Sequence, residues 1–134
     1  AGWRGALGGV IEATIEAMVS LGAAPRRIVA ALGPCLRPPH FEVGPDLIDA
    51  FLARHPQSAR FFHEDRDPAA APDRRQFDLA GFAGWRLAAL GVGRFEDLGL
   101  STLAAPDRWF SYRASRRENA PDYGRNLSAI ALRP

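Results

Sequence analysis

The feature that most constrains the fold is an alternation of amphipathic stretches with apolar runs too short to form helices. Between residues 8 and 21, apolar side chains recur every three or four positions and leave two glutamates on the opposite side. This pattern predicts an amphipathic helix, which Gly22 ends. Residues 28–32 then form an apolar run that stops at Gly33-Pro34 and has the length of a buried strand. We expect this helix and strand to pack as one unit.

Two more helices are predicted from the residues at their ends. Pro45 stands in the first turn of a helix with an apolar stripe, and this helix ends before Pro56 because proline lacks a backbone donor. Asp78 is placed to cap a further helix with its carboxylate, and Gly91 closes that helix. Helical segments are therefore spread along the chain rather than gathered in one block.

Short strands and loops fill the intervals. The residues around 95–100 and the segment 126–132 have the apolar character of strands, whereas residues 33–40, with their prolines, and the charged stretch 64–75 are predicted loops. Helices interleaved with short strands predict an α+β (mixed α/β) fold, a layered sandwich in which helices pack outside mixed β-sheets. The pattern does not decide which strands pair in parallel.

Composition restricts the chemistry. The chain has 134 residues, of which 47% are hydrophobic and 24% charged, and this fits a single domain over residues 1–134. The formal net charge is only +2, so no nucleic-acid partner is implied. All 17 basic residues are arginines, which excludes a lysine Schiff base or a phosphate-loop lysine in this segment.

The number of cysteines and the hydropathy of the chain bear on its cellular location. Cys35 is the only cysteine, so no internal disulfide can form and a cytoplasmic location is expected. No window approaches the roughly 18 apolar residues of a membrane span, and the first residues lack the pattern of a signal peptide. Met18 is the only methionine, and the chain opens within what reads as a structured turn, so we expect it to be part of a longer protein.

Trp3-Arg4-Gly5 is the first candidate for chemistry. The triplet directly precedes the first predicted helix, a position from which Arg4 can bind an anion together with backbone N–H groups. The alternative is that Trp3 anchors the core while Arg4 is solvated or ion-paired. Spacing alone favours this alternative.

Two arginines near the other end of the chain are the second candidate. Arg113 and Arg125 flank a polar turn and can converge on one anion. The alternative is a surface hairpin in which the arginines meet Glu118 and Asp122, with little gain in stability. Without further information the hairpin is the simpler interpretation.

Nucleophilic and metal chemistry have weaker support. Cys35 and His40 share a loop, but no third group is in place to orient the imidazole, and a buried thiol beside an exposed histidine is the simpler interpretation. His40, His55 and His63 follow no metal-ligand spacing. The chain therefore encodes no complete metal site, and a multicopper oxidase would need more histidines than it supplies.

Six short motifs, in this order, resemble those of the laccase-domain (YfiH-type) family of multicopper polyphenol oxidases. They are Ala1-Gly2-Trp3-Arg4-Gly5, Leu32-Gly33-Pro34-Cys35-Leu36, Phe41-Glu42-Val43-Gly44, Phe77-Asp78-Leu79, Phe110-Ser111-Tyr112-Arg113 and Gly124-Arg125. Because they cover the whole chain, the chain is identified as the C-terminal half of a laccase-type domain. The resemblance implies a layered fold of which this chain is about half.

The resemblance also implies an activity. Members are zinc-dependent purine nucleoside phosphorylases, acting on adenosine, inosine, guanosine and methylthioadenosine, with adenosine deaminase activity, and a role in peptidoglycan editing is attributed to bacterial members. It places a metal-binding histidine just before Ala1 and the other ligands further upstream, so a missing N-terminal half would complete the site. Zinc would activate water for deamination, whereas phosphorolysis needs arginine donors for phosphate.

Site residues follow from the same resemblance. Arg4 is the expected catalytic residue, which holds phosphate against the ribose. The residues expected to bind substrate or phosphate are Trp3, Gly5, Tyr112, Arg113 and Arg125. The sequence departs from the family pattern at Ala114, where members often carry a second arginine, at Ser101-Thr102 in place of Cys-Thr, and at His40 in place of cysteine. These departures affect individual side-chain roles.

Two other functions stay open at this point. One is a non-catalytic scaffold or binding segment whose arginines remain on the surface. The other, which the histidine count disfavours, is copper-dependent phenol oxidation, with copper in place of zinc.

Overall fold

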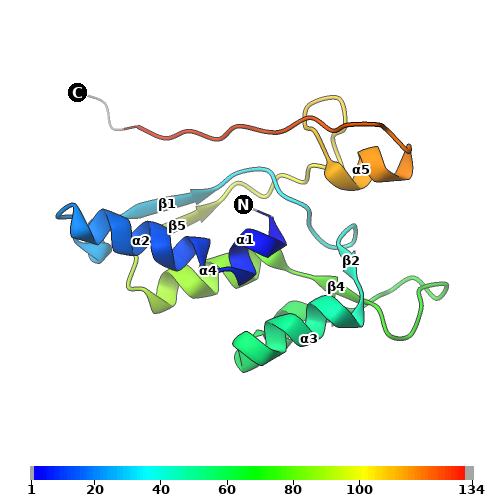
Figure 1. Ribbon diagram of the computed structural model, residues 1–134, viewed down its shortest axis with the longest axis horizontal. Coiled ribbons are helices and arrows are strands. Elements are labelled where there is room, and N and C mark those ends of the chain that lie inside the picture. Colours follow the sequence, from blue (N-terminus) through cyan, green and yellow to red (C-terminus); the bar gives the residue numbers. More distant parts are fainter. Residues whose placement is uncertain (1, 132–134) are drawn as a thin grey trace.

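The computed structural model describes residues 2–131. With η denoting a 3₁₀ helix, the elements follow the chain as α1 (Trp3–Leu7), α2 (Val10–Ser20), η1 (Pro25–Arg27), β1 (Val29–Leu32), β2 (Glu42–Val43), α3 (Pro45–Arg54), η2 (Pro56–Phe61), β3 (Phe62–Glu64), β4 (Arg75–Phe77), α4 (Leu79–Ala89), β5 (Arg94–Asp97) and α5 (Tyr112–Arg117). Helices and two small sheets occur together (Figure 1). The α+β class predicted from the sequence is confirmed.

The strands form two separate sheets. β1 and β5 pair in parallel, with Val29 opposite Arg94 and Leu32 opposite Asp97. The other sheet is antiparallel and has the order β2-β4-β3. Figure 1 shows α2 and α4 on one side of the β1–β5 pair. The chain between β1 and β5 contains the entire second sheet, which is why the parallel pairing could not be read from local pattern.

The three longer helices lie where their end signals predicted them. Pro45 occupies the first turn of α3, and the Asp78 carboxylate caps α4 by accepting a hydrogen bond from the Gly81 N–H at 2.9 Å. Gly84 lets α4 approach β5 closely, since a Cβ at this position would lie 2.8 Å from the Phe95 ring. Local sequence signals therefore determine where these helices begin and end. The absence of a side chain at Gly84 allows the close contact between α4 and β5.

Trp3, Arg4 and Gly5 form part of a helix of their own. The sequence placed the triplet ahead of the long helix, but α1 spans it and two further residues. Gly9 separates α1 from α2 with a φ of 88°, a left-handed conformation that glycine adopts at little cost. The triplet therefore precedes the long helix as expected, but Arg4 lies in the first turn of the short helix α1 rather than at the N-terminus of α2.

The C-terminal part also differs from expectation. The polar turn region contains the helix α5 instead of a hairpin, and residues 126–131 form no strand; Leu132 lies outside the described residues. Figure 1 shows this segment running past β1, and Ser128 lies next to Gly33. An apolar segment becomes a strand only where another strand supplies backbone partners, and none pairs with residues 126–131. Leu127 in this unpaired segment is 93% exposed.

An aromatic core holds α3, α4 and the antiparallel sheet together. We use this name for Phe51, Phe77 and Phe82, whose side chains are fully buried. The Phe51 ring lies 4.8 Å from that of Phe77 and 5.0 Å from that of Phe82, between centroids. Trp3 packs against this core from α1. Each buried phenylalanine contributes about 1.5–3 kcal/mol to stability, so this cluster dominates the packing that positions α1 and β2.

An ion pair connects α2 to α4. The Glu12 carboxylate accepts a hydrogen bond from Arg86 Nε at 2.6 Å, and both side chains are about four-fifths buried. Burial acts to raise the pKa of Glu12, but the hydrogen bond from Arg86 and the backbone, together with the charge of Arg86, lowers it on balance. Glu12 therefore stays ionised, and the pair is a fixed link between the two helices.

None of the helices described between residues 2 and 131 has the length and apolar character that crossing a bilayer requires.

Candidate functional site

Arg4 lies on the surface of α1. Its guanidinium carbon is 4.6 Å from the centroid of the Trp3 ring, a cation–π contact that leaves its N–H donors available. Trp3 itself packs against the aromatic core, so the interpretation of Trp3 as a core anchor is confirmed. Gly5 is an interior residue of α1. Arg4 is thus exposed beside a partly buried tryptophan that packs against the core.

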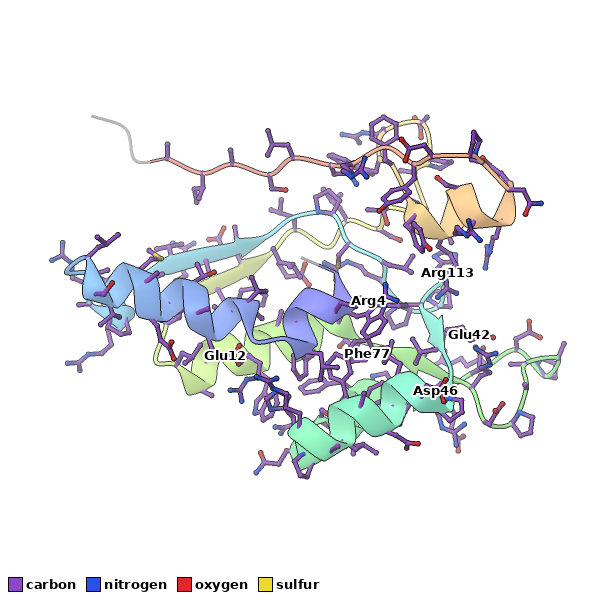
Figure 2. All side chains as sticks on the ribbon, viewed as in Figure 1. Arg4, Glu12, Glu42, Asp46, Phe77 and Arg113 are labelled. Carbon is purple, nitrogen blue, oxygen red and sulfur yellow. The ribbon has the colours of Figure 1, made fainter. Side chains whose placement is uncertain are left out.

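Arg113 is placed by a capped helix. The Ser111 side chain accepts a hydrogen bond from the Ala114 N–H at 3.3 Å and so caps the first turn of α5. From this turn Arg113 Nη2 donates to the Glu42 carbonyl oxygen at 2.8 Å, and its guanidinium carbon lies 5.9 Å from the Phe41 ring centroid. Figure 2 shows Arg113 of α5 and Glu42 of β2 facing each other. The contact joins segments about half a chain apart.

The surroundings of Arg113 are electropositive. Burial lowers the pKa of its guanidinium, the charge of Arg117 lowers it further, Glu42 opposes the change and Arg74 adds to it. Arginine nevertheless keeps its charge in proteins. Arg113 is thus a partly buried cation whose pKa is lowered by burial and by the positive charges of Arg117 and Arg74.

Arg125 has a different partner. Its guanidinium carbon lies 4.7 Å from the Tyr123 ring centroid, and its Nη1 donates to the Tyr123 carbonyl oxygen at 3.4 Å. Tyr112 is 57% exposed and meets Tyr123 edge to face at 4.9 Å between centroids. Arg113 and Arg125 therefore turn to different partners, β2 and Tyr123, and share no hydrogen-bond acceptor among the residues that the structure describes.

Arg74 and Arg117 are neighbours of Arg113 that the sequence reasoning missed. Arg117 follows Arg113 by four residues on α5, a spacing that puts both on one helix face. This signal was present in the sequence, but it carries meaning only for a helix, and the segment was interpreted as a hairpin. No sequence signal connected Arg74, which precedes β4, to these residues.

Cys35 and His40 do not form a catalytic pair. Burial raises the pKa of the Cys35 thiol, while the charge of Arg37 opposes the change, so the thiol is protonated at neutral pH and is a poor nucleophile. No hydrogen bond joins it to His40 within residues 2–131, where the His40 Nδ1 atom is buried without a partner. Cys35 instead joins its loop to the segment after β5 through a backbone hydrogen bond to Leu100 at 3.2 Å.

Metal ligands are not gathered anywhere in the described part of the chain. Over residues 2–131, no group of three or more histidine, cysteine, aspartate or glutamate side chains is arranged to hold a metal ion. Zinc or copper would need such a set. The residues present therefore do not fit a resident metal by themselves.

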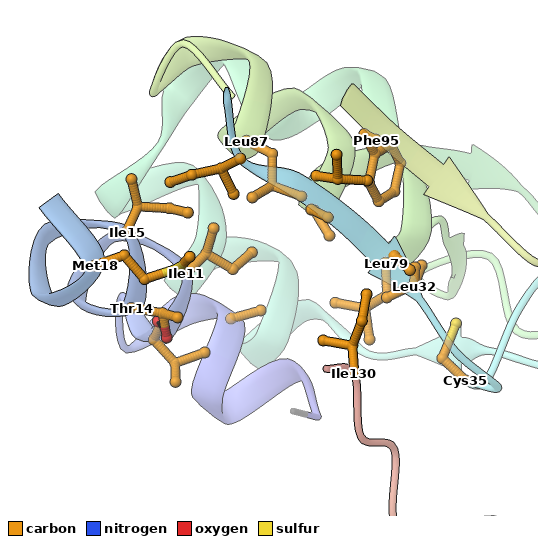
Figure 3. Close-up of a pocket in the computed structure, with 17 residues that line it drawn as sticks. Ile11, Thr14, Ile15, Met18, Leu32, Cys35, Leu79, Leu87, Phe95 and Ile130 are labelled. Carbon is orange, nitrogen blue, oxygen red and sulfur yellow. Dashed lines mark hydrogen bonds between the residues drawn. The ribbon is translucent and has the colours of Figure 1, made fainter. Parts of the chain in front are cut away.

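An apolar pocket of about 440 Å³ opens between α2, β1 and α4. Figure 3 shows Ile15 and Met18 of α2, Leu32 of β1 and Ile130 of the C-terminal segment pointing into it. Its lining contains Thr14 and Cys35 but no charged side chain. A nucleoside and a phosphate need several polar partners, so this pocket alone does not make a nucleoside site.

The comparisons with known proteins define the class. The family described as Multi-copper polyphenol oxidoreductase laccase matches residues 1–133, and the chain belongs to this family. A purine nucleoside phosphorylase of Pseudomonas aeruginosa is 39% identical over 117 residues, which cover 87% of this chain and 46% of that protein. The resemblance inferred from the six motifs is confirmed.

Two further matches add detail. An adenosine deaminase from an unknown prokaryotic organism is 44% identical over 55 residues, which cover 41% of this chain and 21% of that protein. A crystal structure of a Neisseria meningitidis protein matches with a TM-score of 0.72 and 34% identity, over 84% of this chain and 43% of that chain. The chain thus spans about half the length of the P. aeruginosa phosphorylase and of the N. meningitidis protein.

Proposed function

We propose that this chain is part of a purine nucleoside phosphorylase, with adenosine, inosine, guanosine and methylthioadenosine as substrates. The observation that carries the proposal is the similarity to the P. aeruginosa purine nucleoside phosphorylase, which extends over 87% of this chain. The half of the domain that lies outside the chain would complete the site. The lone cysteine supports a cytoplasmic location.

Phosphorolysis assigns a clear task to the arginines. An oxygen of hydrogen phosphate forms a bond to C1′ of the ribose while the bond from C1′ to the purine nitrogen breaks, and the purine leaves with the bonding electrons and takes up the proton that the phosphate gives up. Positive charge develops on the ribose meanwhile, so a phosphate anion held close to it lowers the barrier. Guanidinium groups are suited to hold that anion because they donate two parallel hydrogen bonds.

The individual roles follow from position. Arg4 is assigned to hold phosphate against the ribose, since its donors face solvent from a helix anchored by Trp3. Gly5, the next residue of that helix, is assigned to substrate or phosphate binding. Arg113 assists with phosphate, the exposed Tyr112 ring is available to stack on a purine, and Arg125 is the weaker candidate because it is engaged with Tyr123.

Metal chemistry would come from outside this chain. Residues 2–131 supply no ligand set for zinc, so zinc in the complete protein would be held by other residues, and no step above depends on it. Adenosine deamination is a second candidate activity, favoured by the match to an adenosine deaminase over 55 residues. Copper-dependent phenol oxidation is the third, and it predicts stoichiometric copper and oxygen uptake.

Product analysis separates these functions. The protein encoded by the complete gene is incubated with adenosine, with and without phosphate. Phosphorolysis gives adenine and ribose 1-phosphate only when phosphate is present, whereas deamination gives inosine in either case. A folded protein that yields no product from any purine nucleoside, with or without added zinc, would instead support the scaffold function.

Arg4→Ala tests the assigned catalytic residue. We expect the phosphate-dependent kcat/KM to fall about tenfold or more, because a hydrogen bond to a charged group is lost, while metal content stays the same. Arg26→Ala is the matched control, since Arg26 is also an exposed arginine near a helix but lies on η1. An unchanged response to phosphate in Arg4→Ala would assign Arg4 to structure only.

A further inference from the structure

A second pocket, of about 400 Å³, lies against the antiparallel sheet. We call it the Gln76 pocket. Its lining includes Gln76 of β4, Asp65 directly after β3, and the Pro38-Pro39 pair from the loop after β1. Phe77, the next residue along β4, is buried in the aromatic core, and successive side chains of a strand point to opposite faces of the sheet. Gln76 therefore faces away from the aromatic core.

Gln76 is a buried polar residue with one unused group. Its side chain is only 6% exposed, and its amide oxygen Oε1 is buried without a hydrogen-bond partner among residues 2–131. Its amide nitrogen Nε2 donates to Asp65 Oδ2. Leaving a buried acceptor unpaired is unfavourable. A ligand that brings an N–H donor into this pocket would supply the missing partner.

Asp65 determines which way the Gln76 amide is turned. Its Oδ1 accepts a hydrogen bond from the Asp67 backbone N–H at 3.0 Å, and its Oδ2 accepts the one from Gln76. These two hydrogen bonds lower the pKa of Asp65, so its carboxylate is ionised at neutral pH and can only accept. Turning the amide around would set Gln76 Oε1 against the carboxylate. The amide is therefore locked with its nitrogen engaged and its oxygen free.

The position of Gln76 on the sheet brings it close to an arginine already assigned to phosphate. In the pairing of β4 with β2, Gln76 stands opposite Glu42, and such residues have Cα atoms about 4.5–5.5 Å apart. The Glu42 carbonyl oxygen accepts the hydrogen bond from Arg113 at 2.8 Å. A base held at Gln76 and a phosphate held at Arg113 would therefore be neighbours on one sheet.

We infer that Gln76 recognises the 6-amino group of an adenine base in this pocket and makes the site prefer 6-aminopurines to 6-oxopurines. The inference rests on the proposed function, and it narrows the preferred substrates to adenosine and methylthioadenosine. A 6-amino group donates an N–H to the fixed Oε1 atom, whereas the 6-oxo group of hypoxanthine or guanine brings a second acceptor and leaves both oxygens unpaired. The rings of Pro38 and Pro39 offer an apolar surface to a flat base.

Equilibrium binding of free bases tests the inference without turnover, because a free base has no glycosidic bond to cleave. The protein encoded by the complete gene is titrated with adenine and with hypoxanthine in a calorimeter. We expect adenine to bind about tenfold or more tightly than hypoxanthine. Gln76→Met has a similar size but no acceptor, so it should weaken adenine binding and remove most of this preference. Gln57→Met is the matched control, since Gln57 is exposed on η2.

Asp65→Asn tests the lock on the amide. An asparagine can donate as well as accept, so the Gln76 amide becomes free to turn its nitrogen toward the ligand. We expect hypoxanthine to gain affinity relative to adenine, a change that mere loss of packing would not produce. The melting temperature of each variant shows whether the fold is kept.

Three results would overturn the inference. One is an unchanged ratio of adenine to hypoxanthine affinity in both Gln76→Met and Asp65→Asn. Another is equal affinity of the unsubstituted protein for the two bases. The third is no binding of adenine by the unsubstituted protein at millimolar concentrations.

Two further outcomes separate the inference from the proposed function. A preference for adenine that depends on Gln76, in a protein without phosphorolysis, would support the base site and reject the proposed function. Phosphorolysis of adenosine and inosine with equal kcat/KM, unchanged in Gln76→Met, would overturn the inference and leave the proposed function standing.

Discussion

The aromatic core and the α2–β1 face are both built from apolar residues, yet only the core is closed. We use the second name for the apolar side chains Val10, Met18, Val19 and Val29. Phe51, Phe77 and Phe82 are fully buried, whereas Val19 is 43% and Val29 53% exposed. The closed region receives side chains from α3, β4 and α4 together. Burying apolar side chains is favourable, but a given side chain is buried only where neighbouring helices and strands pack over it.

The α2–β1 face is only partly covered by other elements, and an apolar pocket remains beneath it. The pocket of about 440 Å³ lies under this face and is lined almost entirely by apolar side chains. The partner strands β1 and β5 form an isolated parallel pair within the described chain, an arrangement that usually has both faces covered. This half of the molecule is thus the part where substitutions should matter least in the chain as described.

Truncating the aromatic core should give the largest effect. Phe77→Ala is expected to lower the free energy of unfolding by about 3–5 kcal/mol, because it removes a fully buried ring and leaves a cavity. Urea titration followed by tryptophan fluorescence measures this loss. Val19→Ala, on the α2–β1 face, is the comparison and should change stability by less than about 0.5 kcal/mol. Equal losses for the two variants would contradict the difference drawn between the regions.

Breaking the link between the two regions should come next. Arg86→Met removes the partner of Glu12 and is expected to lower the free energy of unfolding by about 1.5–3 kcal/mol, since a charged hydrogen bond is lost in a mostly buried place. Arg94→Met is the control, because the Arg94 and Glu96 side chains are largely exposed and such pairs contribute little. A loss in the control as large as in Arg86→Met would show that burial does not set the strength of these pairs.

The cap of α4 should have a smaller effect. Asp78→Ala removes the acceptor for the Gly81 N–H and is expected to cost about 1 kcal/mol. Asp78→Asn keeps an acceptor in the same place and should retain most of the stability. Thermal unfolding of the three proteins gives the order, and an Asn variant as unstable as the Ala variant would point to the charge rather than the cap.

The smallest effect is a dependence of stability on pH through His55. Burial lowers the pKa of His55, and the charge of Arg86 lowers it further. The unfolded chain, with an ordinary pKa of 6.5, then binds a proton before the folded one does, so stability is complete above this value and declines as the pH falls below it. Urea midpoints measured from neutral pH down to about pH 5 should show this decline.

A substitution assigns that decline to His55. His55→Gln should flatten the pH dependence of the urea midpoint over this range. If the decline persists in full without His55, another titrating group is responsible.

Sequence signals of different strength explain which parts of the fold were predictable. α2, α3 and α4 carry several turns of periodic apolar residues and clear end signals, and they were found in place. α1 and the strands β2, β3 and β4 span only two to five residues each, too few for a periodic pattern to emerge. Residues 126–131 have the composition of a strand but no partner among the described residues, so composition alone gave a wrong prediction.

Some features of the candidate site were also predictable from the sequence, and others were not. The motifs around Arg4 and Arg113 were sufficient to place the chain in its family, and the match over residues 1–133 confirms it. The arrangement around Arg113 was not predictable, because Glu42 lies 71 positions away and Arg74 lies in the loop before β4. The pairing of Arg113 with Arg125 seemed plausible from proximity in the sequence, but Arg125 turns to Tyr123.

By itself, the sequence determined the long helices, the Asp78 cap of α4, the α+β class and the family, because these depend on short-range periodicity, local hydrogen bonds and short motifs. Only the tertiary structure decided that β1 pairs with β5, that the aromatic core closes while the α2–β1 face stays open, and that Arg113 of α5 donates to the Glu42 carbonyl oxygen of β2. The reason is physical: each of these features depends on contacts between residues far apart in the chain, and such contacts leave no pattern in either segment alone.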